Sequence, residues 1–297
     1  MIGALLALAS AAALGLNTAI VRRGVRWASP YYLIVVSLTA AVPVFFALAW
    51  ASGQLGRAGE LGLSGLGLLA LAGLLNFIGG RYSNFMAIAA IGANLTAPLR
   101  TFSTLFSAVF GFAILNEEVT ALRLLGLGLI IVAPLLAFSR PARMRQELRS
   151  GTRLRLAEGF TFAFVAALSY AGANFLVGYV LAGTGLSLLG AAVAHASAAA
   201  VMLATLALPR NRRGIANLSA NSAYVFLLVS TTMIGAQVFR FAAFERAPVS
   251  VVSALVETLA FFGLAFAFLI NRERELFTRQ VVAGVVLAAC GAIALTA

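Results

Sequence analysis

The chain has 297 residues, of which 62% are hydrophobic and 10% charged, and its mean hydropathy is +1.01. A soluble globular domain is roughly 45–50% apolar and about 25% charged, so this composition excludes a soluble protein and indicates an integral membrane protein. Every charged residue is Arg or Glu, and we expect the formal net charge of +12 to reflect cytoplasmic loops. Nucleic-acid binding is not expected, because no soluble domain remains to provide it.

Ten stretches are long and apolar enough to cross about 30 Å of hydrocarbon, which takes roughly 20 helical residues. In chain order they are residues 2–21, 31–51, 64–87, 93–115, 120–138, 157–182, 185–208, 222–244, 249–270 and 277–296. The first stretch lacks a basic segment before it, so it predicts a membrane helix rather than a cleaved signal peptide.

A basic linker, residues 139–156, divides the chain into segments 1–138 and 157–297. Arginines gather in this linker and in the other odd-numbered loops, for example at Arg22, Arg212 and Arg272. Because basic loops stay in the cytoplasm, this distribution places both termini in the periplasm of a bacterial inner membrane.

The two segments match each other when the chain is shifted by 156 residues. Glu117 then meets Glu273, and with one residue of slippage "GLN" (15–17) meets "GAN" (172–174). Five helices are an odd number, so the second segment must be inserted in the opposite sense to the first. The sequence therefore predicts an all-α membrane protein of ten transmembrane helices in two inverted five-helix repeats, an architecture typical of secondary transporters.

These motifs resemble the EamA type of the drug/metabolite transporter superfamily. The resemblance rests on the Gly-x-Asn of each first helix, on "LNEEV" (115–119) and "LINRERE" (269–275), and on Pro98 in the fourth helix, whose counterpart Ala254 departs from the pattern. It implies a carrier of amino acids, sugars, nucleotide-linked metabolites or drugs, often outward. It also implies cytoplasmic termini, against the arginine distribution.

Four charged residues fall inside predicted helices: Arg81, Arg100, Arg240 and Glu257. Each charge in the bilayer costs roughly 2.5–3.5 kcal/mol on insertion scales and usually faces a partner or a wet cavity. The inverted repeat predicts two polar tiers flanking the midplane, Arg81 with Arg100 in one and Arg240 with Glu257 in the other. Arginine binds carboxylate or phosphate bidentately, so the tiers predict a substrate with an anionic group.

Other interpretations of these charges stay open. Arg81 and Arg240 can snorkel to the interface on their long side chains. Arg100 and Glu257 occupy nearly equivalent positions in the repeat, so each can be a structural counter-ion. Glu257 can also neutralise Arg240, or carry the proton that drives exchange.

Further polar residues in predicted helices are candidates for the substrate site. His195 is either a proton carrier or a hydrogen-bonded packing residue among small neighbours. Asn17 and Asn174 either join helices or bind substrate, and the weaker candidates are Tyr82, Tyr170 and Gln237. Glu117 and Glu273 are expected to cap the helix that follows each of them.

The resulting prediction is a secondary transporter that moves amino acids or related organic anions outward by alternating access, with a possible homodimer and possible proton coupling. A proton-coupled exporter of drugs or cations is the alternative. A channel and a scaffold protein are weaker possibilities. An intramembrane enzyme is disfavoured, because one His, one Cys and no Asp leave no triad or metal site. No metal and no cofactor are expected.

Overall fold

The computed structural model describes residues 1–24, 30–138, 155–208, 211, 220–271 and 279–296. Residues 139–154 of the basic linker and Glu273 lie outside the described residues. The described residues form helices and no strand. These are α1 (Ile2–Gly24), α2 (Pro30–Ala51), the 3₁₀ segment η1 (Gln54–Leu61), α3 (Gly62–Gly73), the π segment η2 (Leu74–Gly80), α4 (Arg81–Arg100), α5 (Phe102–Ile114), α6 (Ala121–Phe138), α8 (Leu156–Leu181), α9 (Ser187–Thr205), α11 (Ala220–Arg246), α12 (Val249–Glu257), α13 (Leu259–Asn271) and α14 (Arg279–Thr296).

Within the described residues, seven helices are long and apolar enough to cross a membrane, and three more are apolar but shorter. The short ones are Phe102–Ile114, Ala121–Ala133 and Val282–Leu295. Each of the ten predicted stretches coincides with one of these helices, and the chain is a multi-pass membrane protein. The count of ten spans and the inverted repeat stay predictions.

Two predicted helix boundaries differ from the structure. The sequence predicted a break between residues 87 and 93, but α4 is helical from Arg81 to Arg100 and the break lies at Thr101. The predicted helix 249–270 is divided at Thr258 into α12 and α13. Hydropathy detects apolar length and not backbone continuity, so it sets neither break.

The chain divides into two compact units. The first unit comprises Met1–Leu74, Leu176–Ala247 and Thr258–Glu275, and the second comprises Leu75–Phe175, Pro248–Glu257 and Leu276–Ala297. Each unit takes segments from both halves of the sequence, so the units are a different division from the predicted repeats.

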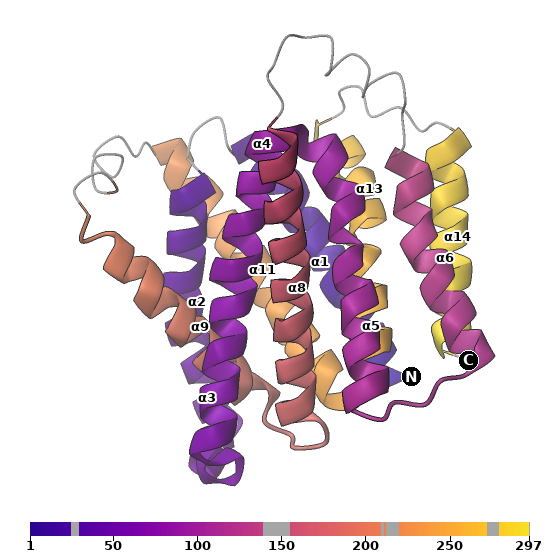
Figure 1. The fold of residues 1–297 in the computed structure, drawn as a ribbon. Coiled ribbons are helices and arrows are strands. Elements are labelled where there is room, and N and C mark those ends of the chain that lie inside the picture. Colours follow the sequence, from indigo (N-terminus) through magenta and orange to yellow (C-terminus); the bar gives the residue numbers. More distant parts are fainter. Residues whose placement is uncertain (25–29, 139–154, 209–210, 212–219, 272–278, 297) are drawn as a thin grey trace. The chain divides into compact units, whose positions relative to one another are not determined.

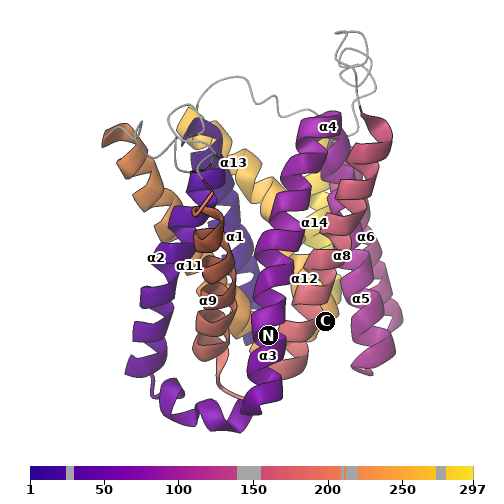
Figure 2. The same cartoon turned by 60° about the vertical axis from the view of Figure 1, so that its left-hand side comes forward.

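In the first unit, α1 packs on α11 and α13, while α2 packs on α9 and α11 (Figure 2). Small residues permit close approaches between these helices. The most pronounced is at Gly73 in α3, where an added Cβ would lie 1.9 Å from the carbonyl oxygen of Ala194 in α9. Ser197 in α9 donates a hydrogen bond of 2.8 Å to the Ala70 carbonyl. Backbone proximity and van der Waals packing therefore hold α3 against α9, as expected where lipid removes the usual hydrophobic driving force.

In the second unit, α6 and α14 lie side by side (Figure 1). Their contact is made by glycine backbone, because a Cβ on Gly126 would lie 2.7 Å from the Gly291 oxygen and one on Gly291 would lie 2.8 Å from the Gly126 oxygen. Gly128, two residues further along α6, would meet no atom within 4 Å.

We expect Gly126→Ala to destabilise the protein and Gly128→Ala to leave it unchanged or slightly more stable. Both variants gain the same helix propensity of roughly 1 kcal/mol, but only Gly126→Ala forces α6 and α14 apart, at a cost of about 1–3 kcal/mol. Thermal unfolding of the purified variants in detergent measures the difference. Equal melting temperatures would contradict the glycine contact.

Candidate functional site

The polar residues of the second unit follow one face of α12. Ser250, Ser253 and Glu257 are spaced at i, i+3 and i+7, so they lie on the same side of the helix. Ser250 and Ser253 are 2% and 4% exposed. Each of the three side chains has a partner from another element of the second unit. We call this row of contacts the polar seam.

At the C-terminal end of α12, Glu257 forms an ion pair with Arg100. Its Oε2 accepts a hydrogen bond of 3.1 Å from Arg100 Nη2, and 14% of the Glu257 side chain and 31% of the Arg100 side chain are exposed. Arg100 is the last residue of α4 and Glu257 the last of α12, so the pair lies where both helices break.

This ion pair corrects the predicted arrangement of two separate tiers. The tiers placed Glu257 with Arg240, yet Glu257 contacts Arg100, and Arg240 belongs to the other unit. The alternative that Arg100 and Glu257 are counter-ions fits the contact. The depths were counted with a helix end between residues 87 and 93 and with 249–270 as one helix, whereas α4 runs to Arg100 and α12 ends at Glu257.

Tyr170 in α8 lies close to both Arg100 and Arg81. Its ring occupies the space beside Gly80, where an added Cβ would lie 2.5 Å from the ring. Arg81 follows directly as the first residue of α4, and its guanidinium carbon lies 5.4 Å from the centre of the Phe77 ring, within range of a cation–π interaction. The second unit thus brings Arg81, Arg100, Tyr170 and Glu257 into one neighbourhood.

One turn along the seam, Asn174 joins three helices. Its Nδ2 donates hydrogen bonds to Ser107 Oγ in α5 at 3.2 Å and to Ser253 Oγ in α12 at 3.1 Å. Asn174 and Tyr170 are four residues apart in α8 and so lie on one face. Three residues before Ser107 in α5, the Thr104 hydroxyl is buried and has no hydrogen-bond partner among the described residues. Asn174 therefore holds α5, α8 and α12 together through fixed polar contacts.

Glu117 caps the N-terminus of α12. Its carboxylate accepts hydrogen bonds from the backbone N–H of Val249, from that of Ser250 at 3.2 Å, and from the Ser250 hydroxyl. Asn116 adopts a left-handed φ of 53°, a conformation that Asn tolerates, and this turn brings Glu117 back beside Gly111, where an added Cβ would lie 2.6 Å from the carboxylate. The prediction that Glu117 caps the helix following it was wrong, because the chain reverses at Asn116.

The remaining predicted site residues of the helix interiors lie in the first unit. Asn17 in α1 donates hydrogen bonds of 2.8 Å to the Val229 carbonyl and to Thr232 Oγ1 in α11. Asn17 and Asn174 therefore each join helices within one unit, which agrees with the packing interpretation of both residues. Arg240 places its guanidinium carbon 5.7 Å from the centre of the Phe244 ring, one turn further along α11.

His195 is 1% exposed in α9, with its ring centre 4.6 Å from that of Phe45 and 6.2 Å from that of Phe241. Its Nδ1 lies 2.7 Å from the Ala191 carbonyl oxygen. Gln237 is also 1% exposed, and its Oε1 has no hydrogen-bond partner among the described residues. These contacts describe a packed histidine, while Gln237 retains an unused acceptor. Tyr82, in the second unit, is 57% exposed.

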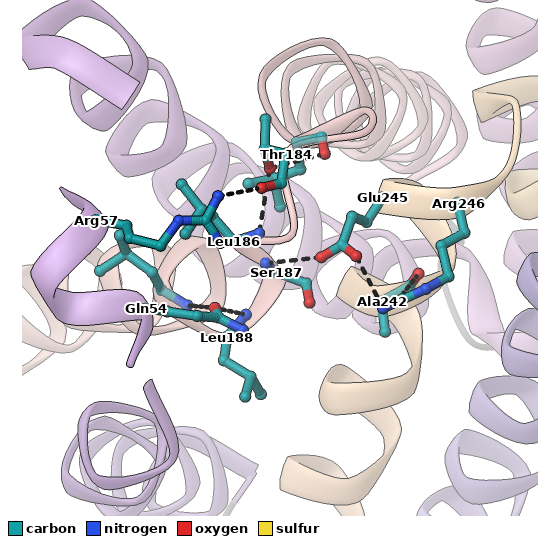
Figure 3. A network of polar contacts seen from close by, with 11 residues as sticks. Gln54, Arg57, Thr184, Leu186, Ser187, Leu188, Ala242, Glu245 and Arg246 are labelled. Carbon is teal, nitrogen blue, oxygen red and sulfur yellow. Dashed lines mark hydrogen bonds and ion pairs between the residues drawn. The ribbon is translucent and has the colours of Figure 1, made fainter. Parts of the chain in front are cut away.

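Sequence reasoning missed a second network, in the first unit (Figure 3). Glu245 and Gln54 cap the N-terminus of α9: Glu245 Oε2 accepts from the Ser187 N–H at 3.0 Å, and Gln54 Oε1 accepts from the next two N–H groups at 2.9 and 3.0 Å. Arg57 donates to the Thr184 carbonyl at 3.0 Å. One signal was present, since an acidic residue at the C-terminal end of α11 is unfavourable for its own helix dipole and therefore points to a partner elsewhere.

No group of three or more His, Cys or Glu side chains that suits a metal ion occurs in the described part of the chain. The polar seam combines the carboxylates of Glu117 and Glu257 with the Arg100 guanidinium and the hydroxyls of Ser250 and Ser253.

We expect Glu117→Gln to lower the free energy of unfolding by about 1–2 kcal/mol, because the variant loses the charge that favours the N-terminus of α12 and weakens up to three hydrogen bonds. Glu118→Gln is the matched control, since the Glu118 side chain is 83% exposed. Thermal unfolding in detergent compares the two variants. A Glu118→Gln protein as destabilised as Glu117→Gln would refute the capping role.

Comparison with known proteins agrees with this architecture. A solved structure described as "Crystal structure of protein" superposes with a TM-score of 0.75 at 12% sequence identity, and the match covers 99% of this chain and 96% of the other. It is one of 27 chains of solved structures that match. At this identity the match establishes the fold alone. No curated protein sequence matches the chain.

Residues 1–139 match the model of the EamA-like transporter family. This confirms the resemblance inferred from the glycine, asparagine and glutamate motifs. The family consists of transporters, so the match suggests a membrane transporter of small molecules.

Proposed function

We propose that this chain, whose residues 1–139 match the EamA-like transporter family, is a secondary transporter of amino acids or related small organic anions. The polar seam of the second unit binds the anionic group of the substrate. Transport proceeds by alternating access across a bacterial inner membrane, and the expected direction is outward.

The observation that carries this proposal is the charge of the neighbourhood around Tyr170. It contains two guanidinium groups, of Arg81 and Arg100, and one carboxylate, of Glu257. Among the described residues these groups carry one net positive charge, which favours an anion over a cation. A guanidinium can also hold a carboxylate or phosphate through two parallel hydrogen bonds.

The broken helices support alternating access. Transporter sites are typically formed by discontinuous helices whose free ends face the substrate. Here α4 and α12 each end at a charged residue of the seam, next to Thr101 and Thr258.

The second candidate function is a proton-coupled exporter of drugs or other cations. It is favoured by Glu257, a partly exposed carboxylate in the neighbourhood. For a cation to bind Glu257, Arg100 would first have to break its ion pair with Glu257. The Arg100 guanidinium would then remain close to the cation and repel it.

A ligand screen separates the two candidates. The purified protein is heated with L-glutamate, L-lactate, glucose 6-phosphate or tetraphenylphosphonium, and its melting temperature is followed. Binding raises the melting temperature in proportion to the logarithm of ligand concentration over Kd. We expect at least one of the anions to stabilise the protein and the cation not to. Stabilisation by tetraphenylphosphonium alone would favour the drug exporter.

We expect Arg81→Ala to reduce counterflow of the stabilising anion in liposomes by at least about tenfold, since losing a buried charge-assisted contact costs about 1.5–3 kcal/mol. Arg240→Ala is the matched control. Arg240 also lies over a phenylalanine ring at a comparable distance, but it belongs to the first unit. Transport by Arg81→Ala at the wild-type rate, in a folded protein, would exclude Arg81 from the site.

Both termini are proposed to lie in the periplasm, as the arginine distribution favours. A C-terminal fusion to alkaline phosphatase should then be active, because that enzyme requires the oxidising periplasm. A matched fusion to green fluorescent protein tests the opposite orientation: fluorescence together with an inactive phosphatase would place the C-terminus in the cytoplasm.

A further inference from the structure

The ion pair between Arg100 and Glu257 joins the last residues of α4 and α12, and both side chains are partly exposed. The contact runs from Arg100 Nη2 to Glu257 Oε2 at 3.1 Å. A guanidinium carries five N–H donors, so Arg100 has the capacity to bind a second anion near Tyr170 and to exchange one carboxylate for another.

The surroundings of Glu257 make Arg100 its dominant electrostatic partner. α12 packs on α5, α6 and α14. α5 contains no ionisable residue, while α6 and α14 each begin with an arginine in their first turn, Arg123 and Arg279, and α14 also carries the exposed Cys290. Arg123 contacts Glu118. From α4 and α8 the facing groups are Arg100, Arg81 and Tyr170.

We propose that the substrate anion displaces Glu257 from Arg100 and that Glu257 then binds one proton, so that a proton and a monoanion move together. This rests on the proposed function, because it requires the anion to bind at Arg100. The hydrogen bond from Arg100 Nη2 to Glu257 breaks, and a hydrogen bond from Arg100 to the substrate oxygen forms. A proton from water adds to the Glu257 carboxylate.

The exchange conserves the charge of the site. Before it, Arg100 is positive and Glu257 negative; after it, Arg100 is positive, the substrate negative and Glu257 neutral. A carboxylate left in apolar surroundings without its cation is costly and takes up a proton. Anion binding and protonation therefore favour each other, and this reciprocity is a thermodynamic requirement of linked binding.

Proton uptake on binding tests this directly. L-Glutamate or L-lactate is added to the purified full-length protein in weakly buffered detergent solution, with a pH-indicating dye to count protons and the melting temperature to report binding. We expect about one proton to be taken up per bound monoanion. Glu257→Gln should bind the anion without proton uptake, and Glu118→Gln should behave as wild type.

The outcomes separate this inference from the proposed function. An anion that binds wild-type protein without proton uptake would overturn the coupling and leave the anion carrier intact. Proton uptake that persists in Glu257→Gln would assign the proton to another group and also overturn it. If neither anion binds, the proposed substrate class fails and the coupling with it. If Glu257→Gln does not fold, the number of protons that the wild-type protein takes up per bound anion still tests the coupling.

Discussion

The structure depends on one constraint, that polar groups among membrane helices need partners because lipid supplies none. The short helix α12 meets this constraint at both of its ends. The Glu117 carboxylate accepts hydrogen bonds from N–H groups in the first turn of α12. At the other end of α12, Arg100 forms an ion pair with Glu257, the last residue of the helix. Between them, Asn174 bonds to Ser253. A nine-residue helix has little intrinsic stability, so these contacts fix its position and, through it, the geometry of the candidate site.

The fold was largely predictable from composition and hydropathy, since each apolar stretch of suitable length became a helix. The internal helix ends next to Thr101 and Thr258 were not, because hydropathy is continuous across both positions. The sequence did not predict that Gly126 and Gly73 lie at close helix contacts. A glycine at a close helix contact and a glycine in open space such as Gly128 have the same sequence signature, and only the arrangement of the helices distinguishes them.

The sequence predicted which residues belong to the candidate site. It did not predict which of these residues contact each other. Arg81, Arg100 and Glu257 were singled out because charges among apolar residues are costly, and all three lie near Tyr170. Their partners come from residues roughly 70 to 157 positions away in the chain, and such distant contacts leave no periodic signal. The same holds for Glu117 and Glu245, whose caps stabilise helices distant in sequence. A sequence shows where the acidic residues are, but it does not show which helix end each of them caps.

The Glu117 cap has an evolutionary consequence. The residue lies in the N-terminal half of the chain, and the helix that it caps lies in the C-terminal half. A change at residue 117 therefore acts on a helix that begins about 130 residues further along the chain, and a chimaera that exchanges one half for that of a relative must carry a compatible acid at this position.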